Sequence, residues 1–116
     1  MGEIVTIGVA SLEEAMDRAK AAFSGEPQGS HVNFVSFDLM WRTLAPKRAA
    51  IVKAMTGKGP LSIREVARRV ERDVKAVHSD VQRLIKSGII DRTEDGKIIF
   101  PYDGIHVDFM LTNEAA

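Results

Sequence analysis

Apolar and polar residues change their spacing several times along the chain, and each change predicts a secondary-structure element. Residues 4–9 are mostly β-branched or apolar, a pattern typical of a strand. Ser11 and Glu14 have the spacing of a capping box, so we expect a helix that starts there and runs to about Phe23. Residues 31–37 alternate and predict a second strand. The expected apolar face of the helix comprises Leu12, Ala15, Met16, Ala19 and Phe23. The first 36 residues therefore predict a β-α-β unit.

From Asp38 the apolar period becomes helical. Pro46 fits the first turn of a second helical piece, where its missing N–H costs nothing, and the glycines and proline of residues 57–60 end that piece. The expected core positions of this stretch are Leu39, Met40, Leu44, Ile51, Val52 and Met55. Two consecutive helical pieces are therefore predicted between Asp38 and residue 57.

Two further helices follow with only three residues between them. Ser62 and Glu65 have the spacing of a second capping box, and Asp73 can cap a helix that ends at Gly88. The expected inward faces are Ile63, Val66, Ala67 and Val70 in the first helix, and Val74, Val77, Val81, Leu84 and Ile85 in the second. Helix, three-residue turn and helix together predict a helix-turn-helix unit.

A hairpin is expected directly after the second of these helices. Residues 89–93 and 97–100 are β-prone runs, and the Asp95-Gly96 pair between them is a strong signal for a tight turn. Residues 105–111 alternate and predict a last strand. We therefore predict an α+β winged helix-turn-helix over residues 37–104, with an N-terminal β-α-β extension over 1–36 and a C-terminal strand and tail over 105–116, in one compact domain.

The composition agrees with a single globular domain. The chain has 116 residues, of which 45% are apolar and 28% charged, as in ordinary water-soluble domains. It contains no cysteine, which removes disulfides and thiolate chemistry and fits a cytoplasmic protein. No stretch has the length or apolarity of a signal peptide or a membrane span, so we expect neither export nor a membrane partner.

The net charge of the chain is zero, but its basic and acidic residues are concentrated in different segments. Residues 42–92 carry thirteen Lys or Arg against five Asp or Glu, whereas residues 1–41 carry two against six and residues 93–116 carry one against five. A basic segment between acidic flanks suggests a local surface for a polyanion.

The helix after Asp73 is the expected reader of that polyanion. With its apolar stripe turned inward, its opposite face carries Lys75, Ala76, His78, Ser79, Gln82, Arg83 and Lys86. Of these, we expect Lys75, His78, Ser79, Gln82 and Arg83 to contact DNA. Lys, Arg, Gln and Ser can all bond base edges in the major groove of DNA, which admits an α-helix. Asp80 on the same helix either pairs with a neighbouring arginine or accepts a hydrogen bond from cytosine, and the sequence leaves this open.

Other polar residues are candidates for contacts to the phosphate backbone, which position a DNA reader without specifying sequence. They are Lys47, Arg48, Ser62, Arg64, Arg92 and Lys97. Trp41 could form an aromatic platform, but a tryptophan among Leu39, Met40 and Leu44 is more often part of the core, and we expect it there.

Three stretches of the chain resemble a known family. They are Leu44-x-x-Lys47-Arg48, Leu61-Ser62-Ile63-x-Glu65-Val66-Ala67, and Val77-x-x-Asp80-Val81-x-x-Leu84-x-x-x-Gly88-Ile89-Ile90. Over residues 36–104 the chain is similar to the MarR-like winged-helix transcriptional regulators of bacteria and archaea, some of which are antitoxin-like. The resemblance implies sequence-specific binding of double-stranded DNA as a dimer, with the helix 74–87 in the major groove and the hairpin near the backbone. The chain departs from the family at Ala45, where a threonine often caps the helix, and at the acidic hairpin tip, Glu94 and Asp95.

No enzyme pattern is present, and we expect no catalytic residue, cofactor or metal site. His31, His78 and His106 fall on separate elements without metal-ligand spacing, and the Gly57-Lys58-Gly59 run lacks the other residues of a phosphate loop. Three strand-like segments lie outside the helix-turn-helix, at residues 4–9, 32–37 and 105–111, and the open edges of a small sheet of this kind predict a homodimer, with residues 1–36 as the expected dimerisation unit. The alternative to a DNA regulator is a winged-helix interaction subunit or antitoxin, whose main surface binds a toxin or another protein.

Overall fold

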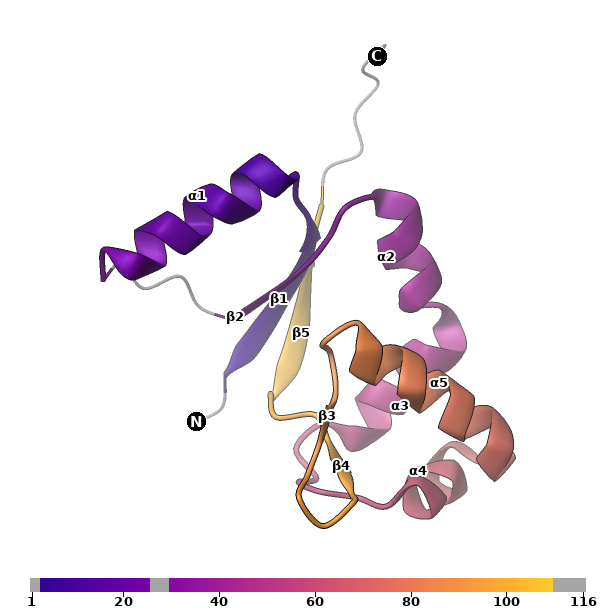
Figure 1. Ribbon diagram of the computed structural model, residues 1–116. Helices are drawn as coiled ribbons and strands as arrows, with labels where there is room; N and C mark the ends of the chain where they lie inside the picture. Colours follow the sequence, from indigo (N-terminus) through magenta and orange to yellow (C-terminus); the bar gives the residue numbers. More distant parts are fainter. Residues whose placement is uncertain (1–2, 26–29, 110–116) are drawn as a thin grey trace.

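The computed structural model of the chain describes residues 3–25 and 30–109, and these form an α+β domain (Figure 1). None of the helices in these two ranges combines the length and apolarity needed to cross a membrane. The elements, in chain order, are β1 (Ile4–Val9), α1 (Leu12–Phe23), β2 (Ser30–Phe34), α2 (Phe37–Thr43), α3 (Pro46–Met55), α4 (Ile63–Val70), α5 (Val74–Lys86), β3 (Asp91–Arg92), β4 (Ile98–Ile99) and β5 (Gly104–Asp108).

The larger sheet is made from both ends of the described chain. Its order is β2-β1-β5, and both pairs are parallel, so β1 is the central strand. Ile7 lies opposite Val32 on one side and Val107 on the other. Gly8 allows a close approach to β5, because an added Cβ would lie 2.5 Å from the backbone oxygen of Asp108. The N-terminal strands β1 and β2 therefore share one sheet with the C-terminal strand β5 and do not pack as a separate extension.

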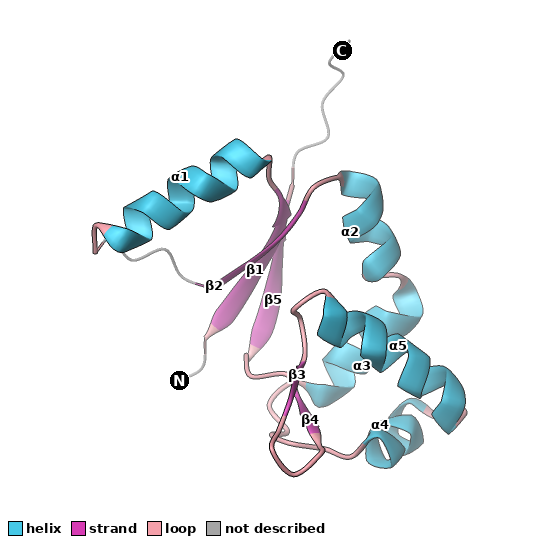
Figure 2. Ribbon diagram, viewed as in Figure 1, coloured by secondary structure: helices cyan, strands magenta, loops and turns pink. Residues whose placement is uncertain are grey.

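The two faces of this sheet meet different helices (Figure 2). Val5 and Ile7 point into the core that also holds Met40 of α2 and Ile51 of α3. The opposite face lies toward α1, whose Glu14 helps to line a polar pocket with residues of all three strands. The predicted strand, helix and strand at the N-terminus are thus present as a parallel β-α-β unit.

The four helices α2 to α5 follow the predicted order. Pro46 occupies the first turn of α3, although Ala45 before it provides no side-chain cap. Between α4 and α5 lies the expected three-residue turn, in which Glu71 adopts the left-handed conformation (φ 56°). Asp73 caps α5 by accepting from the amides of Lys75 and Ala76 at 3.1 and 3.3 Å.

The predicted hairpin is also present, and it is anchored to the helices. β3 and β4 pair antiparallel, and the backbone of Leu61 before α4 forms an additional antiparallel bridge to Ile98. Gly88, at φ 88°, ends the helical segment as predicted. The hairpin is therefore held on α4 through backbone hydrogen bonds as well as through the buried side chains of Ile98 and Phe100.

Most predicted core residues of α2 to α5 are buried or half-buried, but Val74 and Trp41 are exposed. Val77, Val81 and Leu84 of α5 are fully buried, as expected. Val74, expected on the same stripe, is 43% exposed, because it is the first residue of the helix and lies beyond the packed turns. Trp41 is 60% exposed, so the expectation that it belongs to the core is wrong.

The N-terminal unit also differs from its prediction. The second strand ends at Phe34 because Ser36 caps α2, its hydroxyl accepting from the amide of Leu39 at 3.1 Å. Met16 and Phe23 of α1 are 53% and 94% exposed, so the expected apolar face is not buried there; the side chains of Leu12 and Ala15 lie outside the described part. Of the predicted last strand, residues 105–108 are in β5, and residues 110 and 111 lie outside the described residues.

The burial of Leu84 supports a stability prediction. Leu84→Ala should lower the free energy of unfolding by about 2–5 kcal/mol, because it removes a fully buried side chain and leaves a cavity. Urea denaturation followed by circular dichroism measures this change. An exposed residue of the same helix, Lys86, provides the control, and a Leu84→Ala loss as small as that of Lys86→Ala would contradict the packing.

Candidate nucleic-acid interface

The polar side of α5 is open to solvent along most of its length. Lys75, His78, Ser79 and Arg83, all predicted from the sequence, are exposed, and so is Lys86 in the last turn. The N-cap Asp73 fixes where this helix begins, and the buried stripe fixes its rotation. The structure therefore brings four of the five predicted reading residues together on one exposed helix face.

Gln82 is placed differently from the other four. It is half-buried, and its Nε2 is shielded from solvent without a hydrogen-bond partner among the described residues. It lines a groove of about 630 Å³ between α5 and α2, together with Arg83, Lys86 and the apolar side chains of Val35 and Leu39. Gln82 thus lies at the border between the exposed face of α5 and this groove.

Asp80 turns away from the exposed face and forms two ion pairs inside the protein. Its Oδ1 lies 3.0 Å from the Nη1 of Arg48 in α3, and its Oδ2 lies 2.9 Å from the Nη1 of Arg72 in the turn before α5. The side chain of Asp80 is only 14% exposed. Of the two roles that the sequence left open, pairing with a neighbouring arginine is the one observed.

Arg48 is consequently a structural residue. Its Nε donates to the backbone oxygen of Thr43 at 2.7 Å, and its Nη2 donates to the backbone oxygen of Arg42. With Nη1 on Asp80, the guanidinium is engaged on all its nitrogens, so we remove Arg48 from the expected phosphate contacts. Arg72 forms the second ion pair with Asp80, but the sequence did not predict this role. An arginine in a turn gives no local indication that it pairs with a carboxylate eight residues further along the chain.

The remaining backbone candidates are exposed and come from three separate elements. Lys47 lies in the first turn of α3, Arg64 in the first turn of α4, and Arg92 and Lys97 flank the hairpin tip. Among the described residues, none of these four forms an ion pair. They remain available for a charged ligand.

Ser62 caps α4 but does not complete a capping box. Its hydroxyl accepts from the amide of Glu65 at 3.1 Å, whereas the carboxylate of Glu65 turns to Arg68 and Arg69. Hydrogen bonds from Arg68 first, and then from Arg69, lower the pKa of Glu65 below its usual 4.5. The predicted second capping box is therefore half formed, and Glu65 neutralises part of the positive charge on α4.

The acidic hairpin tip is organised locally. The hydroxyl of Thr93 donates to the carboxylate of Asp95, and this bond lowers the pKa of Asp95. The hydroxyl of Thr93 also accepts from the amide of Lys97 at 3.0 Å. The tip thus holds a fixed negative charge between the exposed cations Arg92 and Lys97.

The sheet face toward α1 gathers polar groups that the sequence placed on separate elements. His31 and His106 flank Thr6 on the two neighbouring strands, and Asn33 and Asp108 flank Gly8. With Glu14 and Arg18 of α1, several of these residues line a pocket of about 190 Å³. No group of three or more His, Cys, Asp or Glu suited to a metal ion occurs within residues 3–25 and 30–109.

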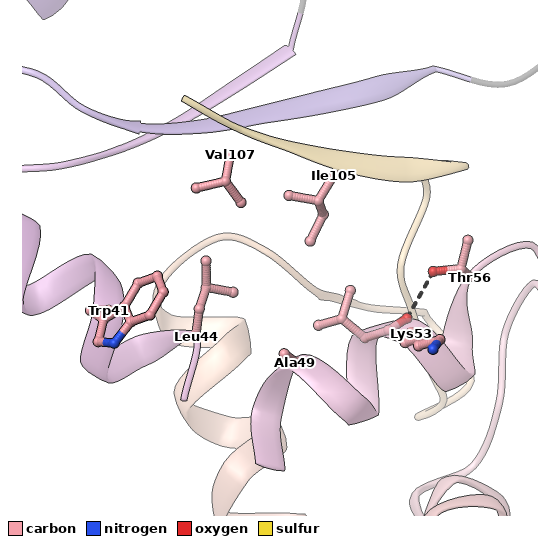
Figure 3. Close-up of a pocket in the computed structure, with 8 residues that line it drawn as sticks. Trp41, Leu44, Ala49, Lys53, Thr56, Ile105 and Val107 are labelled. Carbon is pink, nitrogen blue, oxygen red and sulfur yellow. Dashed lines mark hydrogen bonds between the residues drawn. The ribbon is translucent and has the colours of Figure 1, made fainter. Parts of the chain in front are cut away.

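An apolar groove lies on the other face of the sheet, between β5 and the helices α2 and α3 (Figure 3). It measures about 370 Å³, and Trp41, Leu44, Val52, Ile105 and Val107 line most of it, with Lys53 and Thr56 at one end. Trp41 stacks on Phe37 with ring centroids 5.7 Å apart. Sequence reasoning missed this groove, because its walls come from segments that are far apart in the chain.

The ion pairs of Asp80 support a second stability prediction. Asp80→Ala should lower the free energy of unfolding by about 1.5–3 kcal/mol, because it leaves two partly buried guanidinium groups without their carboxylate. Asp91→Ala removes an exposed carboxylate in β3 and serves as the control, with an expected change within about 0.5 kcal/mol. Equal losses in the two variants, measured by urea denaturation, would contradict a stabilising role for Asp80.

Glu65 supports a prediction on pH. Because its pKa is lowered in the folded protein, its pairing with Arg68 and Arg69 contributes stability above pH 4.5, and this contribution is lost as pH falls through the folded-state pKa. The melting temperature of the wild type should therefore be higher than that of Glu65→Gln at pH 7, and this difference should narrow as the pH falls below 4.5. Glu94→Gln, at a carboxylate without an ion pair to any described residue, should show no such pH-dependent gap.

Comparison with known sequences identifies a family for the segment that contains the helices α3, α4 and α5 and the hairpin. No curated protein matches the chain. Residues 43–107, which run from the end of α2 through α3, α4, α5 and the hairpin to β5, match the family HVO_A0114. Since this match spans more than half of the 116 residues, the chain is a member of the HVO_A0114 family.

Proposed function

We propose that this protein is a winged-helix, MarR-like transcriptional regulator that binds double-stranded DNA and places α5 in the major groove. A helix, a three-residue turn, a second helix and a hairpin follow one another in the order that this assignment requires. The reading residues are Lys75, His78, Ser79 and Arg83, with Gln82 at the border of the contact.

The position of Asp80 is the observation that carries this proposal. A carboxylate on the exposed side of α5 would repel phosphate, and Asp80 is the only acidic residue within the helix. Its two ion pairs with Arg48 and Arg72 hold it away from that side. The exposed face of α5 therefore presents hydrogen-bond donors and positive charge, the combination that base edges and phosphates require.

The hairpin is assigned to the DNA backbone and not to the minor groove. Arg92 and Lys97 are exposed on either side of the tip, whereas the tip itself carries the acidic residues Glu94 and Asp95. Lys47 and Arg64 add further phosphate contacts near the starts of α3 and α4. These contacts orient α5 but supply no sequence information.

A dimer is part of the proposal. A single short helix offers a small contact area, and two-fold dimers that read two half-sites about 34 Å apart are a general solution for helix-turn-helix readers. A protein-interaction subunit is the other candidate function, and it is favoured by the exposed apolar groove at Trp41.

Selection of DNA fragments that the purified protein retains distinguishes these two candidates. A regulator should enrich a common sequence and lose affinity steeply as salt rises, because each phosphate contact releases counterions. Retention without enrichment, or no retention at 50 mM salt, would contradict sequence-specific DNA binding and favour the interaction subunit.

Alanine variants of α5 test the assignment of the reading helix. Lys75→Ala and His78→Ala should each weaken binding to the selected sequence by about 1–3 kcal/mol per lost base contact, without a change in thermal stability, because both side chains are exposed. Fluorescence anisotropy with labelled DNA measures the affinity. Lys20→Ala removes an exposed lysine of α1 as a matched control. Affinities of Lys75→Ala and His78→Ala equal to that of Lys20→Ala would exclude α5 as the reader.

A further inference from the structure

The outer edge of β5 is open among the residues that the structure describes. Within the described ranges, β5 pairs with β1 on one side only. It contains no proline or lysine, the residues that most often protect an edge from pairing with another chain. Its side chains alternate, with Ile105 and Val107 on the face toward α2 and α3 and His106 and Asp108 on the opposite face. An edge of this kind can accept one more antiparallel strand.

The apolar groove runs directly beside this edge. Val107 is 40% exposed, and it lines the groove opposite Trp41 (Figure 3). Phe109, which follows β5, extends the same apolar surface, since its ring centroid lies 6.3 Å from that of Trp41 and 4.8 Å from that of Phe37. A strand added to β5 would therefore also cover an apolar surface that is otherwise open to water.

The sequence of β5 is complementary to itself in one antiparallel register. When two copies pair around Val107, His106 of each lies opposite Asp108 of the other, so that two imidazole–carboxylate contacts form on the polar face. On the apolar face, Ile105 lies opposite Phe109 and Val107 lies opposite Val107 of the second copy. Pairing around His106 instead would set the two imidazoles opposite each other and leave Asp108 opposite Gly104.

We propose that the chain forms a two-fold dimer in which the β5 strands pair antiparallel around Val107, giving a continuous six-stranded sheet. In this dimer, the apolar side chains of the second copy's β5 strand cover the groove beside Trp41. This interface lies on the C-terminal strand, one of the three strand-like segments from which the sequence predicted a dimer, and not on residues 1–36, which were the expected dimerisation unit. The interface deepens the proposed function, because it identifies the surface through which the proposed dimer forms. The experiments below are made without DNA, so they test this interface separately from DNA binding.

The absence of cysteine from the natural chain allows a direct test of the register. Directly opposed residues in an antiparallel pair have Cα atoms about 4.5–5.5 Å apart, which is within the range of a disulfide. Val107→Cys should therefore oxidise to a covalent dimer on a non-reducing gel. His106→Cys tests the neighbouring register, and Asn33→Cys tests the other sheet edge, on β2. Faster crosslinking of either control than of Val107→Cys would overturn the proposal.

A swap of the paired residues tests the polar contacts. His106→Asp sets carboxylates opposite each other and Asp108→His sets imidazoles opposite each other, so each single variant should raise the dimer dissociation constant at least tenfold. The double variant, His106→Asp with Asp108→His, restores both contacts in reverse and should recover most of the affinity. Melting temperatures of all three variants report whether the sheet itself is intact. Failure of the double variant to recover, with an unchanged melting temperature, would contradict this register.

Sedimentation equilibrium of the wild-type protein without DNA tests whether the dimer forms. We expect a mass of twice 12.8 kDa at tens of micromolar. Trp41 is the only tryptophan, so its emission should shift to shorter wavelength as concentration rises and the groove is covered. A mass of 12.8 kDa at that concentration would overturn the proposal. DNA binding by a protein of that mass would leave the proposed function standing, and a dimer without DNA binding would leave this interface standing.

Discussion

Burial of the apolar stripe of α5 is the constraint on which the candidate site depends. Val77, Val81 and Leu84 have no solvent exposure, and their partners come from α3, α4 and the segments around the hairpin. A helix held in this way cannot rotate without exposing several large side chains, at a cost of about 1.5–3 kcal/mol for each. The directions of Lys75, His78 and Ser79 are therefore set by buried residues on the opposite side of the helix.

The charge arrangement follows from the same packing. Asp80 lies beside the buried stripe, where a lone carboxylate would be costly, and Arg48 and Arg72 supply the compensating charge from two other elements. Removing one partner of such a partly buried cluster is more disruptive than removing an exposed charge. The net effect is a helix whose negative group points inward and whose positive groups point outward, in a chain with a net charge of zero.

Elements with strong local signals could be predicted from the sequence. The caps at Ser11 and Asp73, Pro46 at a helix start and Gly88 at a helix end all act through neighbouring backbone groups, so the sequence alone contains the cause. Trp41 and Arg48 could not be placed in this way. The exposure of Trp41 depends on where β5 ends, and the role of Arg48 depends on a carboxylate thirty-two residues away. A pattern of neighbouring residues contains no information on contacts between segments that lie far apart in the chain.

The position of β1 between β2 and β5 has a consequence for the order of folding. Ile4 lies beside Gly104, so the central strand cannot gain its second neighbour until nearly the whole described chain has left the ribosome. The helices α3, α4 and α5 pack together over short sequence separations and can form earlier, because local contacts require less loop-closure entropy than distant ones. During synthesis, one edge of β1 therefore remains unpaired until β5 is made. An unpaired apolar strand edge can pair with another chain, so we expect the tendency to aggregate to be greatest in this interval.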